Sequence, residues 1–233
     1  MSEALPSRLV LFDIDGTLID GHGIGGRAVC RAVFETYGVH GELGDYSFHG
    51  WTDPAIVRDL AVLWGSPEDR VGPLVFECLR RYTTHLQEEV TFGRIDVLPG
   101  VRELVSALAA EPQVLLGLLT GNVEVGARTK LAPTGLWPLF AVAAYGSDSP
   151  RRSDLPAVAI ARAEYVCGHR FVGKEIVIIG DTPADVACGG HLGVKAVAVA
   201  TGRHSREELA ALGPDHVFAD LSDWRAALAA IMA

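Results

Sequence analysis

Short apolar runs alternate with amphipathic stretches along most of this 233-residue chain. The runs are rich in Val, Ile, Leu and Ala, which is typical of strands buried on both faces of a sheet. We predict strands at residues 9–12, 114–119, 141–145, 176–179, 196–200 and 216–219. We predict helices at residues 101–110, 123–131, 157–166, 184–192 and 224–231. The alternation predicts an α/β fold in which helices wrap a parallel, Rossmann-like sheet.

Residues 21–95 interrupt this alternation. They contain no convincing strand pattern, but they contain helical patterns at residues 26–37, 54–63 and 73–89. Four glycines between positions 21 and 26 permit a bend where the segment begins. We predict a small helical cap domain at 21–95, inserted into an α/β core made of residues 1–20 and 96–233. The alternative is that these helices belong to one single domain with the rest.

The composition limits the classes of partner. The net charge of −9 disfavours general binding to nucleic acid or to an anionic membrane surface, both of which need a basic patch. The apolar run at 114–119 is too short to span a bilayer, and residues 1–8 lack the pattern of a signal peptide. The four cysteines form no CxxC pair, so we expect thiols in a reducing, cytoplasmic environment. No pattern indicates an oligomeric state.

Polar and acidic residues follow three of the predicted strands. They are Asp13 and Asp15 after the first, Thr120, Gly121 and Asn122 after the second, and Asp181, Thr182 and Asp185 after the fourth. Ligands of open parallel sheets bind at the carboxyl ends of the strands, so we expect these groups to converge. Ionised carboxylates near an apolar core are costly unless a cation or hydrogen bonds hold them. The simpler alternative is that some of these residues only cap helices.

Three of these stretches resemble motifs of the haloacid dehalogenase-like superfamily. Residues 13–17, Asp-Ile-Asp-Gly-Thr, are similar to its first motif, DxDGT. Residues 119–122 are similar to the second motif, and residues 180–185 to the fourth, GDxxxD. The helical insertion resembles the small cap of this superfamily, in the style of its phosphoglycolate phosphatase-like branch. The resemblance extends over nearly the whole chain.

This resemblance implies a Mg²⁺-dependent phosphatase that hydrolyses a small-molecule phosphate monoester through an aspartyl-phosphate intermediate. Asp13 would be the nucleophile, and Asp15 would protonate the leaving oxygen and later deprotonate the hydrolytic water. The implied ligands of Mg²⁺ are the Asp13 carboxylate, the Asp15 backbone carbonyl and the Asp181 carboxylate. We expect a nearby cation to keep Asp13 ionised, whereas Asp15 could hold a proton.

Further residues are expected to surround this centre. Asp185 lies one helical turn beyond Asp181, so we expect it, with Thr182, to support the metal from outside the ligand set, Asp185 by holding a metal-bound water. The Thr120 hydroxyl and the backbone N–H groups of Gly121 and Asn122 could hold phosphate oxygens at a helix N-terminus.

The chain departs from the superfamily at the third motif, which is usually a lysine. Lys174 and Lys195 precede their strands and so belong to the wrong edge of the sheet, and Lys130 lies about 12 Å along a helix from Asn122. Arg151 and Arg152 remain as candidates, and we favour Arg152 because it stands in the expected interval. An arginine could serve, since its guanidinium binds phosphate with two hydrogen bonds. Alternatively, both arginines are solvated and the protein is a weakened phosphate-binding module.

The insertion offers candidates for contact with the leaving group. Residues 50–54 resemble a substrate loop, and within it we select Trp51, with His49 beside it. The alternative for this loop is helix capping by Thr52 or Asp53 before Pro54. Other functions also remain open: a phosphomutase, a dehalogenase that needs no Mg²⁺, and a phosphate-sensing module.

Overall fold

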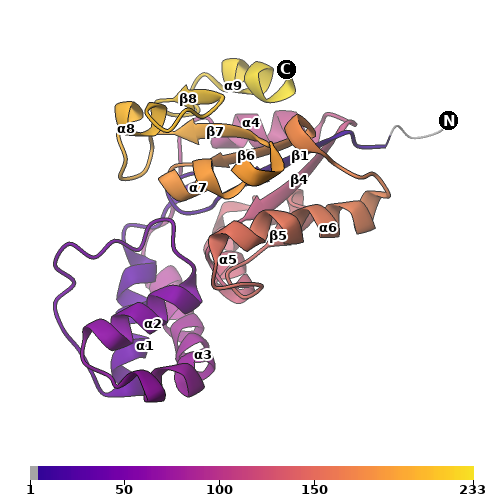
Figure 1. The fold of residues 1–233 in the computed structure, drawn as a ribbon. Coiled ribbons are helices and arrows are strands. Elements are labelled where there is room, and N and C mark those ends of the chain that lie inside the picture. Colours follow the sequence, from indigo (N-terminus) through magenta and orange to yellow (C-terminus); the bar gives the residue numbers. More distant parts are fainter. Residues whose placement is uncertain (1–4) are drawn as a thin grey trace.

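A parallel six-stranded sheet lies at the centre of the computed structural model, which describes residues 5–233. The strands are β1 (Arg8–Phe12), β4 (Val114–Leu119), β5 (Val142–Ala144), β6 (Ile176–Gly180), β7 (Lys195–Val199) and β8 (His216–Phe218). Their order is β5-β4-β1-β6-β7-β8, and every neighbouring pair is parallel (Figure 1). The α/β prediction is confirmed, and the six predicted strands are present with small shifts at their ends.

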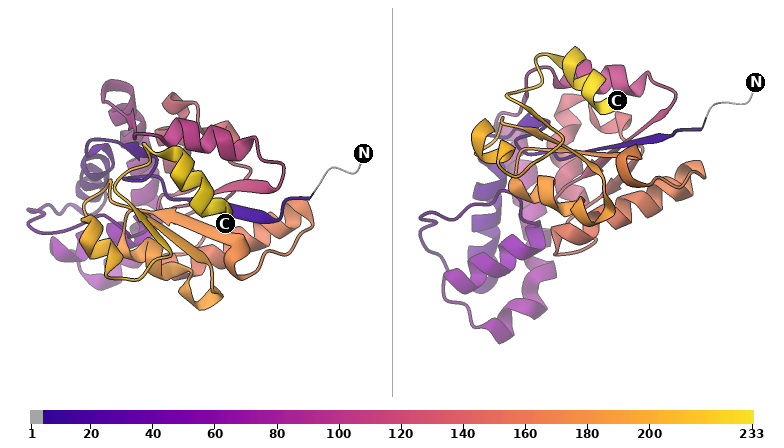
Figure 2. Two further views of the ribbon diagram at one scale, coloured as in Figure 1. Left: turned by 90° about the horizontal axis from the view of Figure 1, so that it is seen from above. Right: turned by 45° about the horizontal axis from the view of Figure 1, so that its top comes forward.

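Helices cover both faces of this sheet (Figure 2). One face packs against α4 (Val101–Ala109), α5 (Glu124–Leu131) and α9 (Trp224–Met232), and the other against α6 (Leu155–Cys167) and α7 (Pro183–Cys188). The side chains of β1 alternate between these two cores: Val10 and Phe12 join the first, and Leu9 and Leu11 the second. A further short helix, α8 (Arg206–Ala210), follows β7.

The position of β1 determines where a ligand site can form. Leu9–Phe12 pair with β4 on one side and with β6 on the other. The chain order reverses at this point, and the carboxyl ends of the three strands lie next to one another. In open α/β sheets this is the place at which ligands bind.

Three helices between β1 and β4 form a hydrophobic core of their own. They are α1 (Ile24–Tyr37), α2 (Asp53–Leu63) and α3 (Glu68–Phe92), and they lie beyond the carboxyl end of the sheet (Figure 1). A short antiparallel pair, β2 (Ile19–Asp20) and β3 (Asp96–Val97), joins the chain where it enters and leaves this segment, which we call the helical insertion. All three helical patterns are confirmed, whereas the division into domains stays a prediction. Within residues 5–233, no helix combines the length and the apolar character needed to cross a membrane.

Candidate active site

Three buried carboxylates meet at the carboxyl ends of β1 and β6. Asp13 follows β1, Asp181 follows β6, and Asp185 lies in the first turn of α7. One oxygen atom from each carboxylate lies within 4.8 Å of the other two. Thr182 is the N-cap of α7, and its hydroxyl donates to Asp185 Oδ2 at 2.5 Å. The structure therefore brings together acids that are far apart in the sequence, and it also confirms the capping role of Thr182.

The carboxylates of this cluster disfavour one another's ionisation, and the expectation that a nearby cation keeps Asp13 ionised stays a prediction. Burial, together with the negative charges of Asp185 and Asp15, raises the pKa of Asp13 to about 7, although Arg152 opposes this. Burial and the neighbouring Asp13 also raise the pKa of Asp181 well above its ordinary value. Without a cation, the protein favours protonation of these carboxyl groups, because crowded negative charges repel one another in a site with little water.

The cluster fits a hard divalent cation. Thr17 donates to Asp181 Oδ1 at 3.0 Å, but Asp181 Oδ2 is buried and has no hydrogen-bond partner within the described part of the chain. Buried carboxylate oxygens normally have a partner, so this atom is suited to a ligand. A donor set made only of oxygen atoms is the kind that Mg²⁺ prefers.

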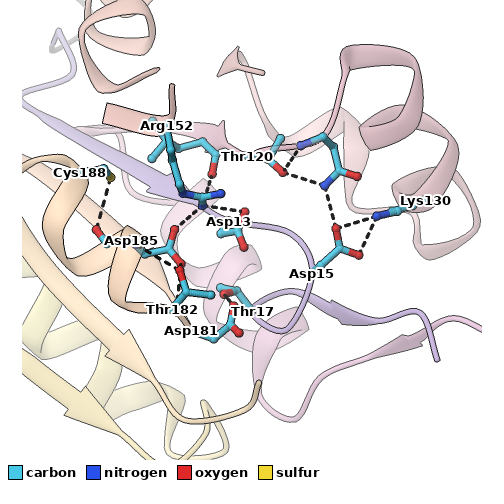
Figure 3. Close-up of polar contacts among 12 residues, drawn as sticks. Asp13, Asp15, Thr17, Thr120, Lys130, Arg152, Asp181, Thr182, Asp185 and Cys188 are labelled. Atoms are coloured by element: carbon cyan, nitrogen blue, oxygen red, sulfur yellow. Dashed lines mark hydrogen bonds and ion pairs between the residues drawn. The ribbon is translucent and has the colours of Figure 1, made fainter. Parts of the chain in front are cut away.

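Arg152, and not Arg151, points into the site. Its guanidinium lies 3.1 Å from Asp13 Oδ1 and also contacts Asp185, and only 8% of its side chain is exposed. It comes from a short turn just before α6. Figure 3 shows it beside Asp13 and Asp185. Arg151 is 78% exposed and pairs with Asp154 at 3.0 Å. The arginine that we favoured from the sequence is thus placed next to the predicted nucleophile.

The loop after β4 is arranged differently from our expectation. The hydroxyl of Thr120 is fully buried and accepts hydrogen bonds from the Asn122 side chain at 2.8 Å and from the Asn122 backbone N–H at 3.2 Å. The Asn122 side chain also donates to Asp15 Oδ2 at 2.7 Å. The N–H that we expected to face phosphate is therefore directed at Thr120, and Asn122 holds Asp15. A Cβ atom at Gly121 would lie 2.0 Å from the carbonyl oxygen of Trp51, so only glycine fits there.

Lys130 is a site residue that the sequence analysis missed. Its Nζ atom lies 2.9 Å and 2.7 Å from the two carboxylate oxygens of Asp15, and only 5% of the lysine side chain is exposed (Figure 3). Burial alone would raise the pKa of Asp15, but Lys130 and Asn122 outweigh it and lower that pKa. The expectation that Asp15 could hold a proton is therefore wrong for this structure, in which its partners favour the carboxylate. Lys130 is distant from Asn122 along α5, but Asp15 comes from the end of β1 and lies beside the last turn of that helix.

The helical insertion contacts the core through the residues that begin α2. Thr52 caps α2, as one alternative from the sequence predicted, and its hydroxyl also donates to the carbonyl oxygen of Pro150 at 2.8 Å. The backbone N–H of Asp53 donates to the Gly121 carbonyl oxygen at 2.8 Å. The Asp53 carboxylate accepts a 2.8 Å hydrogen bond from the Val123 N–H. The loop of Trp51 is therefore attached directly to the loop after β4.

A cavity of about 680 Å³ lies between the helical insertion and the core. Its lining includes the predicted site residues Asp13, Asp15, Thr120, Gly121, Asn122, Arg152 and Trp51. It also includes Lys130 and three residues that no sequence motif indicated, Thr201, Gly202 and Arg203. The buried carboxylates of Asp181 and Asp185 lie behind this surface, next to Asp13.

Comparisons with known proteins agree with the geometry. A family model described as HAD-hydrolase-like matches residues 154–224. A phosphoglycolate phosphatase of Synechococcus elongatus is 27% identical over 232 residues, which cover 96% of this chain and 98% of that protein. A phosphoglycolate phosphatase of Rhodospirillum rubrum is 33% identical over 150 residues, covering 63% of this chain and 59% of that protein.

A solved structure has the same fold. The crystal structure of a predicted phosphoglycolate phosphatase from Haemophilus somnus superposes with a TM-score of 0.71 at 21% identity, covering 96% of this chain and 99% of that chain. The sequence motifs, the family match and the two relatives agree with one another, and the solved structure shares the fold. The chain is thus similar to phosphoglycolate phosphatases, and residues 154–224 match a HAD-hydrolase-like family model.

Proposed function

We propose that this protein is a Mg²⁺-dependent phosphatase that hydrolyses a small-molecule phosphate monoester through an aspartyl-phosphate on Asp13. The observation that carries the proposal is the meeting of the Asp13, Asp181 and Asp185 carboxylates beside the buried guanidinium of Arg152. The two relatives named as phosphoglycolate phosphatases support it.

Asp13 is placed to attack phosphorus. A bond forms between a carboxylate oxygen and phosphorus while the bond from phosphorus to the leaving oxygen breaks. Arg152, 3.1 Å from Asp13, can offset charge on the transferred phosphoryl oxygens. Asp13 and Asp181 would hold Mg²⁺, with Asp185 beside them, and the bound ion would supply positive charge that favours the ionised nucleophile.

Asp15 serves both halves of the reaction. The leaving oxygen takes a proton from Asp15, and Asp15 then takes a proton from the water that attacks the aspartyl-phosphate. The second role requires a carboxylate, which is the form that Lys130 and Asn122 stabilise in this structure. Thr120 and Gly121 lie before the N-terminus of α5, where phosphate oxygens are favoured electrostatically.

The helical insertion would act as a cap, as residues 21–95 were expected to do. Thr52 and Asp53 attach it to the core beside the cavity, so closure of the insertion would exclude water and present Trp51 to the leaving group. The buried position of Arg152 argues against the weakened phosphate-binding module, because that alternative needs a solvated arginine.

Phosphate release tests the function. The protein with Mg²⁺ and a panel of small phosphate esters, phosphoglycolate included, should release inorganic phosphate. Asp13→Asn should reduce release at least about 10⁴-fold, because it removes the nucleophile. Asp45→Asn, an exposed acid outside the cavity lining, is the matched control and should retain activity.

Other outcomes would identify the alternatives. Isomerised ester without net phosphate release would indicate a phosphomutase. Mass spectrometry that finds stable phosphate on Asp13, with no turnover, would indicate a sensing module. Absence of turnover on every ester, in a folded protein that binds Mg²⁺, would contradict the phosphatase.

A further inference from the structure

The loop that follows β7 is hydrogen-bonded to the turn that carries Asp15 and Gly16. The Thr201 hydroxyl donates to the carbonyl oxygen of Gly16 at 2.5 Å, and Gly16 directly follows Asp15. A Cβ atom at Gly202 would lie 1.8 Å from Asp181 Oδ2, so the backbone of this loop packs against the acid cluster. Two consecutive residues of the loop are therefore held next to the proposed reaction centre.

Arg203 comes next, about 3.8 Å further along the Cα trace, and lines the same cavity. Its side chain is exposed and makes no hydrogen bond or ion pair with any residue between 5 and 233. The other lysine and arginine side chains of the cavity lining, Arg27, Lys130 and Arg152, are each paired with carboxylates. In a chain of net charge −9, the cavity thus keeps one guanidinium that is available to a ligand.

Arg203 lies in the part of the cavity that also contains His49 and Asp15. His49, from the helical insertion, lines the cavity together with Arg203. Burial lowers the pKa of His49, Asp15 opposes this, and the positive charges of Arg203 and Lys130 lower it further. These groups are therefore close enough for the charge of each to affect the others. Because Asp15 exchanges its proton with the leaving oxygen in the proposed reaction, these groups lie near the leaving group.

We propose that Arg203 binds a second negative charge on the leaving group, so that the substrate is a phosphate monoester whose leaving group is itself anionic. A carboxylate and a second phosphoryl group both suit a guanidinium, which binds either with two parallel hydrogen bonds. The assignment rests on the proposed phosphatase and adds to it a specificity residue from the core, opposite the insertion.

Ligand binding tests this assignment without turnover. Calorimetry with Mg²⁺ present would compare phosphonopropionate and propane bisphosphonate with propylphosphonate, which lacks the second charge. The wild-type protein should bind at least one of the two anionic analogues about 10- to 100-fold more tightly than propylphosphonate, as expected for a charge-assisted hydrogen bond. The tighter of the two identifies the kind of second charge.

Variants show whether Arg203 is responsible. Arg203→Ala should remove the preference, and Arg203→Lys should restore part of it, because the charge returns without the planar fork. Arg206→Ala removes an exposed arginine at the start of α8, outside the cavity lining, and should keep the preference. In kinetics, Arg203→Ala should lower the ratio of kcat/KM for phosphoglycolate over ethyl phosphate by a similar factor.

Failure of this inference differs from failure of the phosphatase. Equal wild-type affinity for all three phosphonates, or an Arg203→Ala variant that weakens all three equally, would overturn the role of Arg203 and leave phosphate release intact. An Arg203-dependent preference in a protein that hydrolyses no ester would overturn the phosphatase and leave an anion site.

Discussion

Lys130 and Asn122 together fix the carboxylate of Asp15 in space. Three hydrogen bonds of 2.7 to 2.9 Å reach its two oxygens from the end of α5 and from the loop after β4. Lys130 is nearly fully buried, so its charge is poorly screened by solvent. An acid–base group needs an orientation as much as a pKa, and these two neighbours supply both.

Replacing Lys130 should therefore impair chemistry more than binding. Lys130→Met should lower kcat about 10- to 100-fold with little change in KM, because Asp15 keeps only Asn122 as a partner. Lys130 lowers the pKa of Asp15 in the structure, so its removal should move the acidic limb of the pH–rate profile to higher pH. Steady-state kinetics across pH, on esters with good and poor leaving groups, would measure both effects.

Lys174→Met is the matched control for this prediction. It removes an exposed lysine that pairs with Asp215 at 2.6 Å, away from the cavity. This variant should keep the wild-type kcat and pH profile. An unchanged kcat in Lys130→Met itself would show that Asn122 alone positions Asp15.

At the scale of elements, the buried strands could be predicted closely because their apolar runs are nearly continuous. The end of α7 could not: a helix at 184–192 was expected, but it ends at Cys188, and Gly190–Leu192 form a separate 3₁₀ turn. The glycines at 189 and 190 explain the break, since glycine weakens a helix interior. The helix α3 begins at Glu68 and not at the expected Pro73, which lies inside the helix although an interior proline removes one backbone hydrogen bond.

The residues of the candidate site could likewise be predicted only in part. Asp13, Thr120 and Asp181 follow buried strands, so the sheet topology predicts that they meet. Lys130 and the loop at 201–203 could not be placed in this way. They lie at the end of a helix and beyond a strand nearer the edge, and their approach depends on how α5 and the β7 loop pack, which no local pattern records.

Asp53 links α2 to the core through its carboxylate, which is buried where a negative charge is costly. Burial raises its pKa to about 6, although Lys130 and the Val123 N–H oppose this. Because the folded-state pKa exceeds the ordinary value of 3.8, the folded state holds the proton more tightly than the unfolded state. The resulting stability is complete below about pH 3.8 and is lost as the pH rises through about 6.

Asp53→Asn should remove this dependence on pH. Asparagine can still accept from Val123, and it has no charge to bury, so the variant should gain stability over wild type between pH 4 and pH 8, by at most about 3 kcal/mol. Urea unfolding of both proteins across this range would measure the difference. Asp59→Asn, on an exposed position of the same helix, should show no such trend. A difference that is constant with pH would contradict the assignment to Asp53.

At the scale of the whole molecule, the acid cluster concentrates negative charge next to the cavity between the helical insertion and the sheet. Folding brings Asp13, Asp181 and Asp185 within 4.8 Å, and the unfolded chain does not. A cation bound by them would therefore favour the folded state by linkage.

Mg²⁺ should raise the free energy of unfolding by about 2.7 kcal/mol at one hundred times its Kd. Asp181→Asn should lose most of this gain, yet it should be more stable than wild type in chelator. It removes a carboxyl group whose ionisation is disfavoured by burial and by Asp13, and whose Oδ2 atom has no partner in the described chain. Thermal unfolding with Mg²⁺ or chelator would measure both. Asp45→Asn, an exposed loop variant, should respond to Mg²⁺ as wild type does, and an equal response in Asp181→Asn would exclude Asp181 as a ligand.

The hydrogen bond from the Asp53 N–H to the Gly121 carbonyl oxygen joins the first turn of α2 to the loop beside the nucleophile. Its proton can exchange with deuterium from solvent only when α2 separates from that loop or when the protein unfolds. The exchange rate of this one amide, relative to amides of the central strands, therefore reports how often the cavity opens.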